Sequence, residues 1–156
     1  MSSVLVHKYR RNGSGQGIYG NGRFGRDLFR GASNIPLMKI LRTLARVCTT
    51  SLNETVLFYE NLTGTITVSR FGMPTIGLEL AVVQDILIIG GTEDTLRPFR
   101  PTSATLLVDS LDEYHRFLTA HGAAIIRPPQ VVPTGRNMIV RHPDGSIVEY
   151  VEHTTR

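Results

Sequence analysis

The feature that most constrains the fold is a pattern that occurs twice in the chain. Residues 51–54 read Ser-Leu-Asn-Glu and are followed by Phe58, while residues 110–113 read Ser-Leu-Asp-Glu and are followed by Phe117. Ser, Leu, Glu and Phe stand at the same relative positions in both copies. A repeated unit of this size cannot bury its apolar face alone. We therefore expect two copies of one supersecondary unit that pack together and leave a cleft between them.

The first copy predicts a helix among strands. Residues 39–49 alternate partly and contain β-branched residues, which favours a strand. Ser51 and Glu54 form the Ser-x-x-Glu capping box of a helix start, and Gly64 is expected to end that helix. Its buried stripe is predicted to comprise Leu52, Val56, Tyr59 and Leu62. Three further strands are expected over residues 66–71, 75–82 and 86–89, with a tight corner at Gln84-Asp85.

The second copy repeats this order after a Pro-containing linker over residues 92–101. A strand is expected over 102–108, and Ser110 caps a helix that runs to Ala120 with Leu111, Tyr114, Phe117 and Leu118 on its inner face. Strands follow over 123–127, 137–141 and 147–151, the last two joined by a Pro-Asp-Gly turn at residues 143–145. The predicted fold class is α+β, with two βαβββ modules, about 39–91 and 102–153, forming a curled mixed sheet around a cleft.

The net charge of +4 comes from one end of the chain. Residues 1–37 hold six basic residues against one acidic residue, and seven of the 15 glycines. We interpret them as a flexible Gly/Arg-rich extension ahead of a domain over 38–156, for which Met38 would be the start. A transit peptide and a nucleic-acid tether are the alternatives. The rest of the chain is nearly neutral, so it gives no reason to expect nucleic-acid binding.

Cysteine content and hydropathy bear on the compartment. Cys48 is the only cysteine, so no internal disulfide can form, which fits a reducing compartment such as the cytoplasm. No apolar run approaches the roughly 18 residues of a membrane span. We therefore expect a cytoplasmic protein without a membrane segment.

The repeated βαβββ order resembles the vicinal oxygen chelate superfamily, which includes glyoxalases, extradiol dioxygenases and bleomycin-resistance proteins. The resemblance covers about residues 39–153. It depends on Phe58-Tyr59 at the end of the first helix, on Val108-Asp109-Ser110-Leu111, and on the stretch His-Pro-Asp-Gly-Ser-Ile-Val-Glu over 142–149. It implies a ligand cavity between the modules and a homodimer.

The resemblance also implies four metal-ligand positions, usually His, Gln or Glu, on the first and last strands of the modules. Glu149 matches the last of them. The first-strand candidate is Leu44, or Arg42 with a shifted alignment, and the other candidates are Ile86, Ile88 and Ser103. Leu and Ile cannot bind a metal, and a divalent ion needs several well-placed ligands. We therefore expect no metal and no other cofactor.

Glu149 is the predicted catalytic residue if the protein is an enzyme. It lies between apolar residues on a strand, so it is fit for acid–base chemistry or for pairing a cationic ligand. The alternatives are exposure at the cleft mouth or an ion pair with an arginine such as Arg136 or Arg141. Glu79, between two leucines, is its counterpart in the first module. The predicted ligand-binding residues are Glu149, Glu79, Ile86, Ile88 and Ser103.

Three functions are compatible with these features. The first is a metal-free protein, similar to the bleomycin-resistance branch, that binds a small organic molecule in the cleft. The second is a metal-dependent lyase, isomerase or dioxygenase of the same superfamily with displaced ligands. The third is an interaction module whose cavity no longer functions.

Overall fold

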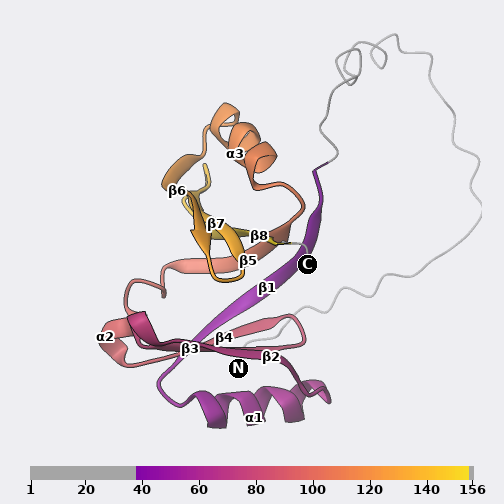
Figure 1. Cartoon of the computed structure of the whole chain (residues 1–156), viewed down its shortest axis with the longest axis vertical. Helices are drawn as coiled ribbons and strands as arrows, with labels where there is room; N and C mark the ends of the chain where they lie inside the picture. The colour runs from indigo at the N-terminus through magenta and orange to yellow at the C-terminus, as the bar shows by residue number, and fades with distance from the viewer. Residues whose placement is uncertain (1–37, 155–156) are drawn as a thin grey trace, which may run out of the picture. The chain divides into compact units, whose positions relative to one another are not determined.

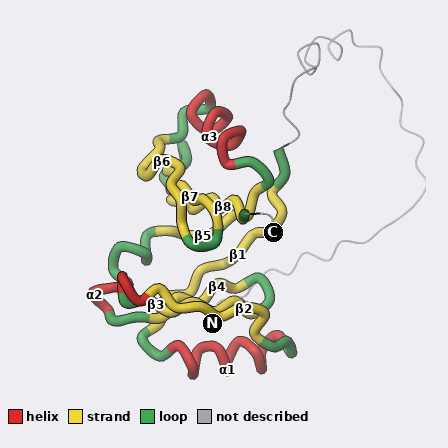
Figure 2. Tube along the Cα trace, viewed as in Figure 1, coloured by secondary structure: helices red, strands yellow, loops and turns green. Residues whose placement is uncertain are grey.

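The computed structural model describes residues 38–154 (Figures 1 and 2). The extension predicted over residues 1–37 lies outside the described part. Eight strands form one mixed, curled sheet in the order β2-β3-β4-β1-β5-β8-β7-β6. The predicted α+β fold class is therefore confirmed. No helix within 38–154 is long and apolar enough to cross a membrane.

The first module supplies one half of the sheet. Its elements are β1 (Ile40–Thr49), α1 (Leu52–Thr63), β2 (Thr67–Met73), the short 3-10 helix η1 (Pro74–Ile76), β3 (Leu78–Val83) and β4 (Ile86–Gly90). Gly64 ends α1 in the left-handed conformation, as predicted. Gln84, at the predicted corner between β3 and β4, has a positive φ of 46°.

The second module supplies the other half. Its elements are β5 (Thr102–Val108), α3 (Leu111–Ala120), β6 (Ala124–Val132), β7 (Gly135–Arg141) and β8 (Ile147–His153). The predicted linker contains a short helix, α2 (Glu93–Leu96). Strand β6 continues past Pro128-Pro129, where the sequence predicts an end. Proline is compatible with β6 because this strand is a sheet edge, where a backbone N–H can face outward without a partner.

The two modules meet edge to edge within the sheet. Strand β1 pairs antiparallel with β5, from Ile40 opposite Val108 to Ala45 opposite Ala104. It also pairs in parallel with β4, and β5 pairs in parallel with β8. Strands β1 and β5 accordingly run through the middle of the view in Figure 1. Each module therefore completes the hydrogen bonding of the other.

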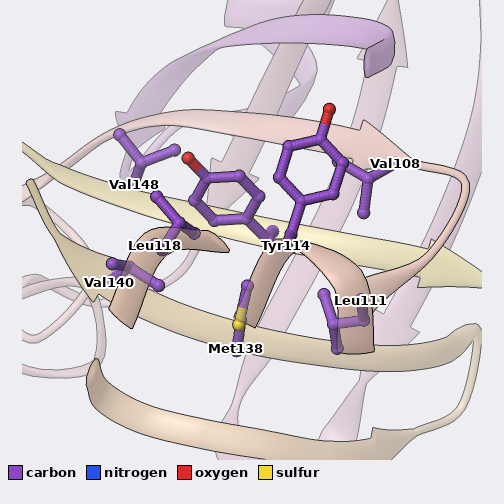
Figure 3. Packing of buried hydrophobic residues seen from close by; sticks show 8 residues of the cluster. Val108, Leu111, Tyr114, Leu118, Met138, Val140 and Val148 are labelled. Atoms are coloured by element: carbon purple, nitrogen blue, oxygen red, sulfur yellow. The ribbon is translucent and has the colours of Figure 1, made fainter. Parts of the chain in front are cut away.

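Helices cover one face of the sheet in each module. Helix α1 packs through Leu52 and Val56 on a cluster completed by Ala81, Val83 and Ile88. Helix α3 packs through Leu111, Tyr114 and Leu118 on Met138, Val140 and Val148 of β7 and β8, as Figure 3 shows. A third cluster, which includes Leu44, Val82 and Leu87, lies on the opposite face of the first module's strands.

The predicted helix faces are partly wrong. Leu62 is 65% exposed because it lies ten residues after Leu52, about 80° around the helix from the buried side. Phe117 is 40% exposed and stacks on the ring of His121, with 4.0 Å between ring centroids. The remaining predicted positions of both stripes are buried or half-buried.

The predicted serine cap forms at the second helix and not at the first. The Ser110 hydroxyl accepts a hydrogen bond from the Glu113 N–H at 3.4 Å. The Ser51 side chain makes no capping bond. Before this helix, the Thr49 hydroxyl accepts from the Ser51 N–H at 3.0 Å and hydrogen-bonds the Thr55 hydroxyl at 2.9 Å. The repeat therefore predicts both helix starts, although the first helix begins without a side-chain cap.

Candidate functional site

A cavity of about 290 Å³ lies between the two modules, on the sheet face opposite the helices. Its walls are mostly apolar, and both modules contribute to them. The apolar residues include Leu44, Phe71, Leu80, Val82 and Leu87 from the first module and Leu107, Val132 and Val151 from the second. The polar lining includes Thr105, Asn137 and Glu149, which lie on adjacent strands.

Glu149 is the centre of a hydrogen-bonded cluster at this cavity. Its Oε2 accepts from Arg46 Nη1 at 2.6 Å and from the Thr105 hydroxyl at 2.9 Å. Its Oε1 accepts from Asn137 Nδ2 at 2.8 Å. Arg46 Nη1 also donates to the Thr105 hydroxyl, at 2.9 Å. Both carboxylate oxygens are therefore already engaged by the protein.

Strand register brings these four residues together. Thr105 is opposite Glu149 in the β5–β8 pairing, and Leu44, two residues before Arg46, is opposite Thr105 in the β1–β5 pairing. Since alternate residues of a strand share a face, Arg46 lies on the same face as Thr105 and Glu149. Arg46 belongs to the first module and Glu149 to the second, so this ion pair joins the modules.

The cluster is largely buried, and two of its polar atoms have no hydrogen-bond partner. The Arg46 side chain is 5% exposed and the Glu149 side chain 18%. Among residues 38–154, Arg46 Nε and Asn137 Oδ1 are buried without any hydrogen-bond partner. Because a buried polar atom is normally paired, such exceptions call for an explanation. One hydrogen-bond donor, Arg46 Nε, and one acceptor, Asn137 Oδ1, are therefore unpaired beside Glu149.

Two predicted site residues lie on the other face of the sheet. Ile88 packs in the cluster beneath α1, with Ile86 against it, and neither lines the cavity. Leu87, between them, is the β4 residue that lines it. A shift of one residue along a strand moves a side chain to the opposite face. The expected placement of Ile86 and Ile88 at the cleft is therefore corrected to Leu87.

The remaining predicted residues also lie outside this cavity. Ser103 is exposed and donates through its hydroxyl to the Ile147 carbonyl at 2.9 Å, while Thr105 takes the cavity position on β5. Glu79 is exposed and accepts from Arg70 Nε at 2.6 Å, a hydrogen bond that lowers the pKa of Glu79. Of the predicted ligand-binding set, the structure places Glu149 alone at the cavity.

The partner of Glu149 also differs from expectation. Arg136, one of the two arginines considered, instead makes a bidentate pair with Asp112, at 2.8 and 3.1 Å. This contact lowers the pKa of the Asp112 carboxyl. Arg46 was missed as a site residue, although it lies two residues after Leu44 on one strand face. The sequence signal for Arg46 is that a charged residue shares a strand face with the buried Leu44, since charged residues are rarely buried without a partner.

The residues at the metal-ligand positions do not fit a divalent metal. Glu149 is the one carboxylate, and the neighbouring positions hold Leu44, Leu87, Thr105 and the Arg46 guanidinium. Within 38–154, no group of three or more His, Cys, Asp or Glu side chains is placed to hold an ion. A guanidinium hydrogen-bonded to the carboxylate would oppose a second cation at the same oxygen.

Several solved structures are similar to this chain. An uncharacterized protein from Methanosarcina mazei is 53% identical, with a TM-score of 0.72 over 76% of this chain and 96% of its own. A methylmalonyl-CoA epimerase from Mycobacterium tuberculosis is 16% identical, with a TM-score of 0.58 over 71% and 86% of the two chains. An epimerase of the same name from Streptomyces coelicolor, in complex with 2-nitronate-propionyl-CoA, is 15% identical, with a TM-score of 0.59 over 75% and 100%.

Comparison with protein-family models gives no match, and comparison with curated proteins gives none either. The epimerases share the fold at low sequence identity, whereas the Methanosarcina mazei protein is similar in sequence over nearly its whole length. Together with the two βαβββ modules and the cavity between them, these similarities show that the chain has the vicinal oxygen chelate fold.

Proposed function

We propose that this protein binds a small, mostly apolar organic molecule in the cavity between its modules, without a metal ion. The observation that carries the proposal is a largely apolar cavity whose one carboxylate already has an internal cation. Ligand sites are typically concave and apolar with a few fixed polar groups. A volume of about 290 Å³, close to the lower limit of about 300 Å³ for ligand pockets, suits a small ligand with one to three rings.

The Arg46–Glu149 pair supports the metal-free part of the proposal. Arg46 Nη1 is 2.6 Å from Glu149 Oε2, so the guanidinium supplies the positive charge that a metal would supply to this carboxylate. A metal-dependent enzyme would require Arg46 to withdraw from a buried position where no other acidic partner contacts it within residues 38–154. Burial makes such a withdrawal costly, because it would leave an uncompensated charge.

Titration with N-phenyl-1-naphthylamine, a neutral dye that fluoresces in apolar sites, tests the proposal. Leu80→Trp puts a large side chain into the cavity, and Leu57→Trp is the matched control on the exposed surface of α1. We expect saturable binding to the native protein and to Leu57→Trp, and at least tenfold weaker binding to Leu80→Trp. No binding to the native protein, or equal binding to all three, would contradict the proposal.

Elemental mass spectrometry of the untagged protein tests the metal-free part separately. We expect less than a tenth of a transition-metal ion per chain, before and after incubation with Zn²⁺, Mn²⁺ or Fe²⁺ and desalting. One ion per chain, lost in Glu149→Gln, would instead support the metal-dependent enzyme. The dye experiment does not depend on this result, so the two parts of the proposal can fail independently.

A homodimer and a cytoplasmic location belong to the same proposal. The single cysteine supports a reducing compartment, and Cys48 is a free, half-buried thiol. Light scattering of the purified chain measures the assembly directly. A mass of twice 17.3 kDa is expected, and a mass of one chain at micromolar concentration would contradict the dimer.

A further inference from the structure

Building on the proposed function, we infer that the ligand ends in a neutral hydrogen-bonding group, a carboxamide or a hydroxyl, and that this group lies against Asn137 and Glu149. The rest of the ligand lies among the apolar walls of the cavity. The inference concerns the chemical class of the ligand and depends on three observations, which concern charge, occupied acceptor sites and an unpaired amide oxygen.

The first observation is that the arginines and the carboxylate at the cavity are paired, Glu149 with Arg46 and the lining residue Arg42 with Asp85. Glu149 contributes one negative charge and Arg46 one positive charge, and their side chains are 18% and 5% exposed. A cationic ligand would be repelled by the guanidinium, and an anionic ligand by the carboxylate. Either ligand would also lose its hydration on entering mostly apolar walls. A neutral polar group avoids both costs.

The second observation is that the carboxylate is already used by the protein. Oε2 accepts two hydrogen bonds, from Arg46 and Thr105, and Oε1 accepts one from Asn137. Three of the roughly four acceptor sites of the carboxylate are therefore taken, and an ammonium group could reach Glu149 directly only at the remaining site on Oε1. This arrangement disfavours the cationic ligand that an unpaired Glu149 would attract.

The third observation is the unpaired oxygen of Asn137. This residue lines the cavity and is 8% exposed, and its Oδ1 has no donor while its Nδ2 is held by Glu149. Because the terminal torsion of an Asn side chain is soft, a modest rotation turns Oδ1 toward a donor in the cavity. A ligand O–H or N–H would supply the missing bond, which a hydrocarbon cannot do.

Four compounds with one phenylbutyl frame and different ends test the inference by isothermal titration at pH 7. They are 4-phenylbutanamide, 4-phenylbutyrate, 4-phenylbutylamine and butylbenzene, whose ends are neutral and polar, anionic, cationic and apolar. We expect the amide to bind about tenfold more tightly than each of the other three. N,N-Dimethyl-4-phenylbutanamide, which lacks the N–H donors, should lose this advantage.

Variants assign the effect to Asn137. Asn137→Leu should bind the amide and butylbenzene with equal affinity, because the unpaired oxygen is gone. Ser69→Ala removes a polar group from the opposite part of the lining and should keep the tenfold preference. The ligand series on the native protein gives an answer even if Asn137→Leu does not fold.

The outcomes separate the inference from the proposed function. Binding of butylbenzene with no gain for the amide would overturn the inference and leave the apolar site in place. Tightest binding of the amine or of the carboxylate would also overturn it, because the Arg46–Glu149 pair would then not be acting as a neutral unit. Failure of all five compounds, together with failure of the dye, would reject the proposed function itself.

Discussion

At the scale of single residues, the Arg46–Glu149 pair is the feature with the largest expected effect on stability. The Arg46 side chain is buried and the Glu149 side chain is 18% exposed, so removal of one partner leaves the other charge uncompensated in a place that water reaches poorly. We expect Arg46→Met to lower the free energy of unfolding by about 3–5 kcal/mol in urea titrations. The double variant Arg46→Met, Glu149→Leu should recover much of this loss, because both charges are then removed.

Arg42, on the same strand, provides the matched control. Its ion pair with Asp85 has side chains that are 36% and 60% exposed. Exposed pairs contribute little because water screens them, so Arg42→Met should cost less than about 1 kcal/mol. Equal costs for the Arg42 and Arg46 variants, or a double variant as unstable as Arg46→Met, would show that burial of the Glu149 pair is not what stabilises the protein.

Tyr150 is expected to make the folded protein less stable as the pH rises above 10. Burial, and secondarily the nearby Tyr114, raises the pKa of Tyr150 to about 12, while the unfolded value is about 10. Between these values the unfolded chain loses the phenolic proton and the folded chain keeps it. Stability is therefore fully present below pH 10 and falls by about 2–3 kcal/mol as the pH rises towards 12.

Urea unfolding at several pH values between 9 and 12 measures this loss. Tyr150→Phe should reduce the slope in that window, although it also removes the hydrogen bond between Tyr150 and His142, which is 2.8 Å long. Because that bond contributes to stability below the window, the slope and not the absolute stability is the informative quantity. An unchanged slope in Tyr150→Phe would assign the alkaline loss to other groups.

At the scale of elements, the sequence predicts the order of strands and helices better than it predicts which face of each element is buried. The repeated Ser-x-x-Glu pattern, Gly64 and the Pro-Asp-Gly turn act locally and mark helix and hairpin ends, whereas the local signal Pro128-Pro129 does not end β6. Leu62 and Phe117 were misplaced because neighbouring positions on a helix differ by 100°. Ile86 and Ile88 were misplaced because β4 is apolar throughout, so no alternation distinguishes its two faces.

The β7 start depends on a glycine that other residues cannot replace. Gly135 has φ of +144°, and a Cβ built there would lie 2.1 Å from the Glu152 carbonyl oxygen on β8. Gly135→Ala must therefore separate β7 from β8 or distort both strands. We expect it to destabilise the protein by at least about 2 kcal/mol in thermal or urea unfolding.

Gly145, in the turn between β7 and β8, is the control for this substitution. It also has a positive φ, +88°, but a Cβ built there meets no atom within 4 Å. Gly145→Ala should therefore cost only the backbone strain, about 1 kcal/mol. A larger loss for Gly145→Ala than for Gly135→Ala would show that the close approach of the β8 backbone is not the deciding contact.

At the scale of the whole molecule, the candidate site exists only when both modules are assembled. Arg46, Thr105, Asn137 and Glu149 come from four strands, β1, β5, β7 and β8, and no short motif contains two of them. Glu149 was predictable because it lies within a recognisable hairpin. The other three become neighbours through strand register, which the sequence does not reveal without the structure.

The same assembly predicts that the two modules unfold together. Strand β1 has hydrogen-bonded neighbours on both sides, β4 in its own module and β5 in the other, and the Arg46–Glu149 pair crosses this boundary. Separation of the modules would expose two sheet edges and leave two buried charges without partners. We therefore expect one cooperative transition for residues 38–154.

Two single-tryptophan variants measure this cooperativity, because the native chain contains no Trp. Tyr59→Trp reports on α1 of the first module, and Phe117→Trp reports on α3 of the second. In urea, fluorescence of either variant should give the same midpoint as its circular dichroism. Two separated midpoints would mean that each module is stable without the other. The cavity between the modules could then open without unfolding either of them.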